Sequence, residues 1–206
     1  MTPNQLFTKI RTDEYKKIGE DVDYKVETIH EEKAVYLMFK GSNSGIDWKL
    51  NFSFGQTVYD NQKNQLYAHK GFIKAWKSAN DTIMEEYINA CNENPDYTPI
   101  ICGHSLGGAL SQLAMEDFCF RTSRKPVVIT FGSPNVWSKK TDMDYLRGCY
   151  ESIVQYANNN DVVPKVPPFY LPLNKIPVGK KSCVLKWVRI TYYHCRSYEY
   201  IDYTKL

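Results

Sequence analysis

The segment GHSLGGAL, residues 103–110, places a serine between two glycines. It follows the apolar residues 100–102, which are typical of the end of a short buried strand. Apolar residues after Ser105 recur at helical spacing, at Leu106, Ala109, Leu110, Leu113, Ala114 and Phe118. The pattern therefore predicts a strand, a sharp turn that carries Ser105, and a helix.

Such a turn suits a nucleophile. Gly103 and Gly107 have no Cβ, so the strand and the helix can approach each other closely around Ser105. The serine hydroxyl then projects above the sheet, where the first N–H groups of the helix point toward a developing negative charge. This arrangement is a nucleophile elbow at residues 103–107. A G-x-S-x-G segment also arises by chance, so a tight turn without chemistry is the alternative.

A serine hydroxyl needs a base that takes its proton, usually a histidine oriented by a carboxylate. In elbow-bearing α/β folds the chain order is Ser, then Asp or Glu, then His. Of the four histidines only His194 comes after Ser105. His194 is therefore the predicted base, against the alternative of a structural histidine.

The acid is selected by its position in the chain. Asp161 follows a predicted strand and the turn-like residues Asn158, Asn159 and Asn160, at a carboxyl end where α/β sheets present their sites. Other acidic residues lie on predicted helices or close to His194: Glu116, Asp117, Asp142, Asp144, Glu199 and Asp202. Asp161 is the predicted orienting acid, and a turn or capping aspartate is the alternative.

Hydrolysis through a serine also requires two donors for the oxyanion. One is the main-chain N–H of Leu106, directly after the nucleophile. The second normally comes from the loop after an earlier core strand, and residues 40–46 follow the apolar run 34–39. Gly41 lets that backbone turn in close, and Ser42 is the predicted donor. An ordinary polar turn is the alternative.

Length and composition restrict the class of protein. The 206 residues suit one domain over 1–206, and 43% hydrophobic with 24% charged residues are ordinary globular values. A net charge of +3, without a basic cluster, argues against nucleic acid. The longest apolar run, 34–39, is too short to span a membrane, so no transmembrane segment is predicted. The first residues carry no signal-peptide pattern; this favours an intracellular protein, with a secreted form whose leader was removed as the alternative.

The six cysteines do not resemble a disulfide framework. Cys102 ends a predicted core strand, and Cys91 and Cys119 lie in helical patterns, so free buried thiols are expected. No C-x-x-C motif or His/Cys cluster indicates a metal site. The proposed chemistry requires neither a metal nor a cofactor.

The remaining segments predict the elements that must position these residues. Two paired strands are expected at 21–29 and 34–40, and further strands at 97–102, 127–131, 152–157 and 183–193. Helices are expected at 72–93, 106–121 and about 140–148. Short buried strands that alternate with helices predict an α/β fold with a mainly parallel sheet covered on both faces.

Together these segments resemble the class 3 lipases, the fungal-type triacylglycerol lipase family of the α/β-hydrolase superfamily. FKGSNSGIDWKLNF resembles the family's oxyanion strand and loop, and ICGHSLGGAL resembles its elbow. AHKGFIKAW, ITFGSPNV, NNNDVVPKVPP and YYHCRSYEYI resemble, in order, the helix before the elbow, the next strand, the acid loop and the histidine segment. The resemblance covers roughly residues 34–203.

The chain departs from the family pattern in two places. Lys40 stands where the family often has arginine, and the stretch from Asp161 to His194 is short. The family builds part of its acyl-chain pocket in that stretch. Five prolines predict a stiff extended loop there rather than a helix: Pro164, Pro167, Pro168, Pro172 and Pro177.

Larger relatives carry a lid after the oxyanion loop, which corresponds to residues 43–56. Trp48, Leu50, Phe52 and Phe54 would share one side of this segment if it were extended. Either a mobile lid or an aromatic-anchored surface loop fits the sequence. Four lysines could add attraction to an anionic lipid surface: Lys49, Lys175, Lys180 and Lys181. For most of them a solvated face is the alternative.

The resemblance implies a lipase-type carboxylester hydrolase that cleaves acylglycerol or related fatty-acyl esters. The expected partners are a lipid or small-molecule ester and, transiently, a lipid interface. The sequence also fits a phospholipase or acyltransferase that uses the same triad, or a non-catalytic lipid-binding relative. It does not define the acyl length, the compartment or the oligomeric state.

Overall fold

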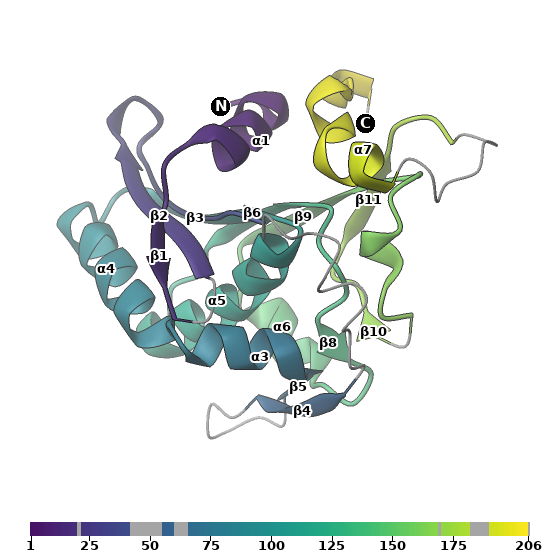
Figure 1. Ribbon diagram of the computed structural model, residues 1–206. Coiled ribbons are helices and arrows are strands. Elements are labelled where there is room, and N and C mark those ends of the chain that lie inside the picture. Colours follow the sequence, from purple (N-terminus) through teal and green to yellow (C-terminus); the bar gives the residue numbers. More distant parts are fainter. Residues whose placement is uncertain (20–21, 42–54, 60–65, 169, 182–189, 206) are drawn as a thin grey trace.

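The computed structural model describes residues 1–19, 22–41, 55–59, 66–168, 170–181 and 190–205 (Figure 1). The predicted oxyanion residue Ser42 and the aromatic residues of segment 43–56 therefore lie outside the described residues. So do Lys49 and residues 182–189, the first part of the predicted strand 183–193.

A seven-stranded sheet forms the centre of the described structure. Its order is β1 (Lys16–Ile18), β2 (Val22–Ile29), β3 (Ala34–Phe39), β6 (Thr98–His104), β7 (Val127–Phe131), β9 (Ser152–Asn158) and β11 (Lys175–Val178). β1, β2 and β3 are antiparallel neighbours, and every pairing from β3 to β11 is parallel. The mainly parallel sheet expected from the sequence is confirmed.

Helices cover both faces of this sheet. In Figure 1, α3 (Lys70–Lys77), α4 (Asn80–Glu93), α5 (Leu106–Thr122) and α6 (Met143–Gly148) lie below it. α1 (Pro3–Thr12) and α7 (Ile190–Cys195) lie above it. The described ranges also contain short 3₁₀ turns: η1 (His30–Glu32), η2 (Val163–Lys165), η4 (Ser197–Tyr200) and η5 (Tyr203–Lys205).

The run AVYLMF of β3 shows why this strand is apolar throughout. Val35, Leu37 and Phe39 belong to the core cluster on the α4–α5 side of the sheet. Ala34, Tyr36 and Met38 belong to the cluster beneath α1 on the other side. Successive strand residues point to opposite faces, and both faces are covered here, so all six side chains are buried.

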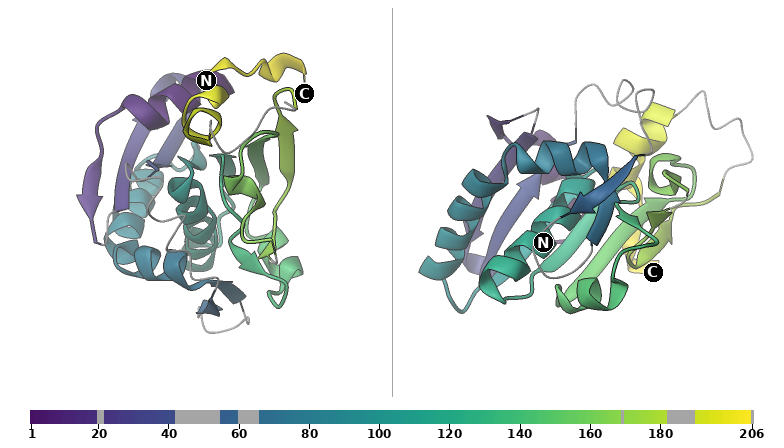
Figure 2. Two further views of the ribbon diagram at one scale, coloured as in Figure 1. Left: turned by 45° about the vertical axis from the view of Figure 1, so that its right-hand side comes forward. Right: turned by 90° about the horizontal axis from the view of Figure 1, so that it is seen from below.

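A second, smaller antiparallel sheet lies beside the main one and was not predicted (Figure 2). Its order is β10 (Tyr170–Leu171), β8 (Trp137–Ser138), β5 (Leu66–His69) and β4 (Gln56–Tyr59). Strands of two to four residues are too short for periodicity to reveal them.

Most predicted core elements are confirmed to within about three residues: the strands at 21–29, 34–40, 97–102, 127–131 and 152–157, and the helices at 106–121 and near 140–148. The helix predicted at 72–93 is instead two helices, α3 and α4. The Ser78 hydroxyl bonds the Ala75 carbonyl at 2.8 Å, and Ala79 leaves the helical region with φ −141°. A side chain that competes for backbone carbonyls favours such a break.

Two further predictions are wrong in part. Residues 190–193 are not strand but belong to α7, because short β-branched runs fit either structure and tertiary packing decides. The proline-rich stretch after Asp161 is not simply an extended loop. It contains the turn η2, where Pro164 occupies a first-turn position that needs no N–H, and β11, an edge strand that accommodates Pro177.

None of the helices in the described ranges combines the length and the apolar character that crossing a membrane requires.

Candidate active site

The predicted elbow is a strained turn between β6 and α5. Ser105 has φ 58° and ψ −122°, which non-glycine residues rarely adopt. A Cβ at Gly103 would lie 2.4 Å from the Gly107 carbonyl, and a Cβ at Gly107 would lie 2.3 Å from the Phe39 carbonyl oxygen. Both positions therefore exclude any other residue, and the close packing holds Ser105 in its strained conformation.

The structure brings Ser105, His194 and Asp161 together. Ser105 Oγ lies 2.6 Å from His194 Nε2, and His194 Nδ1 lies 2.7 Å from Asp161 Oδ2. Their exposed fractions are only 3%, 1% and 1%, respectively. This is the geometry in which a carboxylate fixes the imidazole tautomer and the imidazole removes the serine proton.

Three separate elements deliver these side chains to one point. Ser105 follows the carboxyl end of β6, and Asp161 follows β9, two strands away across β7. The Asp161 N–H donates to the Asn158 carbonyl at 3.0 Å, which closes the turn after β9. His194 comes from α7, above the same edge of the sheet (Figure 1). The site thus forms where parallel strands end, as expected for an α/β sheet.

Asp161 is held by a further residue that the sequence reasoning missed. The Tyr198 hydroxyl donates to Asp161 Oδ2 at 3.0 Å, and the Val163 N–H donates to Oδ1 at 3.0 Å. Tyr198 in turn accepts a bond from the Asn158 N–H at 2.9 Å. Burial, reinforced by the Asp161 carboxylate, raises the pKa of Tyr198 well above its usual value, so it remains a donor. Its place four residues after His194 was the available signal.

The side chain of His104, the residue before the predicted nucleophile, holds the main chain of the predicted base. Its Nε2 donates to the His194 carbonyl oxygen at 2.8 Å, and the two imidazole rings lie 4.7 Å apart. The His104 ring also packs edge-on against Phe7 of α1 at 5.3 Å. His104 therefore anchors α7 and does not contact the serine hydroxyl through any bond that the structure describes.

One predicted oxyanion donor can be placed, and so can Gly41, the residue that precedes the other. Leu106 is the first residue of α5, where main-chain N–H groups lack helical partners. Gly41 packs against the elbow, since a Cβ there would lie 3.1 Å from Ser105 Cβ. The chain that leads into Ser42 is therefore beside Ser105, although Ser42 itself is outside the described residues.

Lys175 is misassigned as a possible lipid contact. Its Nζ is part-buried behind the acid loop, where it donates to the Asn135 side chain and to the Pro164 carbonyl. Burial lowers the pKa of Lys175 to about 8, while the charge of Asp161 opposes that shift. Lys180 and Lys181 are exposed, so their possible lipid contact stays a prediction.

The other acidic residues have different partners. Glu116 accepts a bond from Tyr145, and Asp117 from Trp76 and Arg121. Asp142 caps α6 through the N–H groups of Asp144 and Tyr145.

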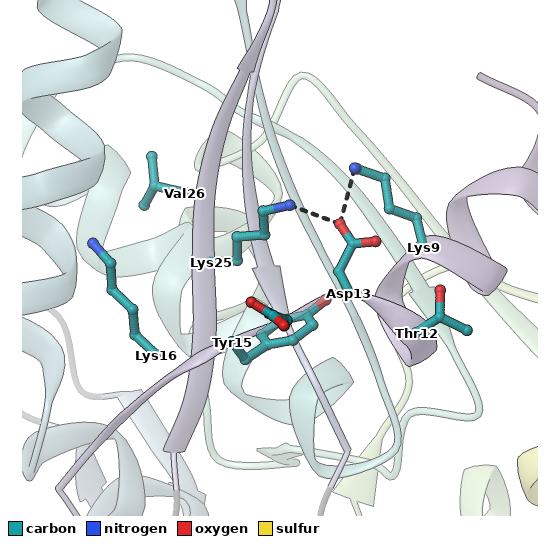
Figure 3. A pocket seen from close by; sticks show the side chains of 8 residues that line it. Lys9, Thr12, Asp13, Tyr15, Lys16, Lys25 and Val26 are labelled. Atoms are coloured by element: carbon teal, nitrogen blue, oxygen red, sulfur yellow. Dashed lines mark hydrogen bonds and ion pairs between the residues drawn. The ribbon is translucent and has the colours of Figure 1, made fainter.

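A surface hollow of about 750 Å³ lies between α1, β1 and β2 (Figure 3). The ammonium groups of Lys9 and Lys25 both point at the Asp13 carboxylate, at 2.9 and 2.7 Å. The lining consists of Lys9, Thr12, Asp13, Glu14, Tyr15, Lys16, Lys25 and Val26. It contains no member of the predicted triad.

The parallel sheet and the strained elbow at its edge define an α/β-hydrolase. Within that class, the chain belongs to the class 3 lipase family, whose pattern it matches over residues 36–171.

Relatives and solved structures agree with this assignment. A secreted mono- and diacylglycerol lipase A of Penicillium cyclopium is 30% identical over 140 residues, covering 67% of this chain and 44% of the relative. A lipase of Rhizopus oryzae is 31% identical over 144 residues, covering 66% and 36%. The chain thus spans less than half the length of either relative. The structure of Rhizomucor miehei triacylglyceride lipase superposes with a TM-score of 0.74 at 22% identity, covering 82% of this chain and 67% of that one.

Proposed function

We propose that residues 1–206 form one α/β-hydrolase domain that acts as a serine carboxylester hydrolase of lipase type. The observation that carries this proposal is the buried chain of contacts from Ser105 through His194 to Asp161, at 2.6 and 2.7 Å. Its substrates are acylglycerols or related fatty-acyl esters, the class suggested by the relatives' names.

In this mechanism Ser105 Oγ attacks the ester carbonyl carbon while His194 Nε2 accepts the hydroxyl proton. Asp161 holds the imidazole and stabilises it when it becomes charged. The main-chain N–H groups of Leu106 and Ser42 stabilise the tetrahedral oxyanion, and each such donor contributes about 10²–10³ in kcat in comparable sites. His194 then gives the proton to the departing alcohol. Water, activated by the same imidazole, hydrolyses the acyl-enzyme.

The test is turnover of p-nitrophenyl esters from two to twelve carbons, with a triglyceride and a phospholipid in parallel. We expect hydrolysis of the short and medium esters and its loss in Ser105→Ala. A preference for the phospholipid, or acyl transfer to an added alcohol in place of water, would replace the lipase assignment. No turnover of any ester by the folded protein would contradict the enzymatic function altogether.

Response to an interface is tested by measuring the rate of a sparingly soluble ester across its solubility limit. We expect only a modest gain, because segment 43–56 is short and carries few aliphatic anchors. A rise of tenfold or more on emulsification would contradict this expectation and indicate a working lid.

A further inference from the structure

The last residue of β9, Asn158, is buried and forms hydrogen bonds in two directions. Toward the acid loop, its Oδ1 accepts from the Asn160 N–H at 2.8 Å, and its carbonyl accepts from the Asp161 N–H at 3.0 Å. Toward the histidine segment, its Nδ2 donates to the Ser197 hydroxyl at 2.7 Å, and its N–H donates to the Tyr198 hydroxyl at 2.9 Å. One residue therefore joins the two segments that carry the predicted acid and the predicted base.

The Ser197 hydroxyl extends this link to the main chain beside the base. It donates to the Tyr193 carbonyl, four residues earlier, at 2.6 Å. Tyr193 directly precedes His194 in α7, so this carbonyl belongs to the peptide group that joins the two residues. A hydroxyl has a single proton to donate. Because that of Ser197 goes to the carbonyl, its oxygen accepts from the Asn158 amide.

These partners determine how the Asn158 amide is oriented. The Asn160 N–H can only donate, so it faces Oδ1. The Ser197 oxygen, whose proton is engaged, faces Nδ2. Each end of the amide thus meets a partner of the opposite kind. A buried polar network in which these bonds are satisfied is rigid, so the acid loop and α7 are held at a fixed spacing.

The predicted base is anchored from two sides. The His104 side chain, which comes from the elbow, holds the His194 carbonyl at 2.8 Å and thereby fixes α7 relative to Ser105. Asn158 follows β9 and fixes α7 relative to the acid loop. The first anchor bears on the 2.6 Å contact between His194 Nε2 and Ser105 Oγ. The second bears on the 2.7 Å contact between His194 Nδ1 and Asp161 Oδ2.

We propose that Asn158, acting through Ser197, is a positioning residue that holds His194 within hydrogen-bonding distance of Asp161. This inference rests on the proposed hydrolysis by the triad. A displacement of about 1 Å can lower a catalysed rate by about 10²-fold. The anchor at His104 and the direct bond to Asp161 remain when the link is cut, so the expected loss is smaller, about 10-fold.

The test measures hydrolysis of a p-nitrophenyl ester by Asn158→Ala, Ser197→Ala and the double variant. The temperature is one at which circular dichroism shows every variant to be folded. We expect each single substitution to lower kcat by about 10-fold with KM little changed. Both substitutions break the same link, so the double variant should lose no more than the more impaired single variant. A double loss equal to the product of the single losses would overturn the proposed action through Ser197.

Thr122→Val is the matched control. The Thr122 hydroxyl, at the opposite end of α5 from Ser105, donates to the Phe118 carbonyl at 2.6 Å and accepts from the Arg124 N–H at 3.1 Å. It resembles Ser197 in the kinds of bond that it forms, and its removal should leave kcat unchanged. A fall in kcat equal to that of Ser197→Ala would attribute the effect to a general loss of stability and overturn the proposal.

A measurement without substrate separates this proposal from the proposed function. The proton that His194 Nδ1 donates to Asp161 gives a far-downfield ¹H NMR resonance when its exchange with water is slow. We expect this resonance to be sharp in the wild type and in Thr122→Val, and to broaden in Ser197→Ala. If the wild type hydrolyses no ester, the proposed function fails, and the resonance still reports the contact. An unchanged resonance in Ser197→Ala, or a wild-type kcat in that variant, would overturn the proposal.

Discussion

The triad and the hollow beside α1 both gather charged side chains, but they arrange them in opposite ways. In the hollow, Asp13 is paired with Lys9 and Lys25, and each lysine also pairs with Glu27. These side chains remain 21–29% exposed. At the triad, Asp161 and His194 are 1% exposed, and the chain of bonds leads from a carboxylate to a single hydroxyl.

The difference shows why the volume of a surface hollow does not identify an active site. The charges around the hollow neutralise one another in contact with solvent, where an ion pair contributes about 0–1 kcal/mol. Around Asp161 every described partner donates to the carboxylate, and only His194 passes the effect on to a reactive atom. A buried chain of hydrogen bonds that ends on a hydroxyl can polarise that nucleophile. Surface ion pairs that neutralise one another cannot.

The largest effect is expected when the carboxylate of the triad is neutralised. Asp161→Asn should lower kcat on a p-nitrophenyl ester by about 10⁴, because the imidazole loses the partner that fixes its tautomer. Asp142→Asn is the matched control, since asparagine also caps a helix well, and it should retain wild-type activity. The assignment of Asp161 fails if the control loses activity and Asp161→Asn keeps it.

Removing the donor behind that carboxylate should have a smaller effect. Tyr198→Phe deletes the bond to Asp161, and a hydrogen bond to a charged group contributes about 1.5–3 kcal/mol. We expect kcat to fall by roughly 30-fold with KM little changed. Tyr87→Phe removes the hydroxyl of another fully buried tyrosine, one that bonds only main-chain carbonyls among its described partners, and should change stability alone. Equal kcat values for the two variants would show that Tyr198 does not position Asp161 for catalysis.

Lys175 tests the electrostatics behind the acid loop. Burial lowers its pKa to about 8, below the unfolded value of 10.5. Between these two pH values the unfolded chain binds the proton more tightly, so this residue's contribution to the free energy of unfolding rises with pH. Relative to Lys175→Met, the wild type should gain about 2 kcal/mol from pH 8 to pH 10 in urea unfolding. A difference that is constant with pH would mean that Lys175 has an ordinary pKa.

The smallest effect is expected in the hollow. Burial opposes ionisation of Asp13, but the bonds from Lys25 and Lys9 outweigh it and lower the pKa of this carboxyl. The group is substantially solvated, so Asp13→Asn should destabilise the protein by no more than about 1 kcal/mol, less in high salt, and leave kcat unchanged. A tenfold change in ester hydrolysis would show that the two regions are coupled.

The sequence predicts the parts of this molecule in which local pattern and tertiary role coincide. The apolar run of β3 and the helical spacing after Ser105 each specify an element that the core then buries. His194 follows from chain order and Asp161 from its place after a strand. Tyr198 lies four residues after His194, but this spacing alone does not show its role, which depends on a turn that brings it behind a residue 37 positions away.

Other features depend on contacts that no local pattern contains. The strands β4, β5, β8 and β10 exist through their pairing with one another and are too short to show a period. Residues 190–193 alternate like a strand, yet they form α7, which holds His194 over the elbow with help from His104. Lys175 looks like a surface lysine in sequence, and its acceptors come from the loop of Asn135 and from Pro164 in η2.

The central claim is that this fold activates one serine. The most direct test is to label the native protein with a fluorophosphonate and to locate the adduct by mass spectrometry, with Ser105→Ala, His194→Ala and urea-unfolded protein as controls. We predict one adduct, on Ser105, that is absent from Ser105→Ala and from the unfolded chain and is strongly slowed in His194→Ala. An adduct that persists in Ser105→Ala, or that forms on another serine in the native protein, would contradict the account.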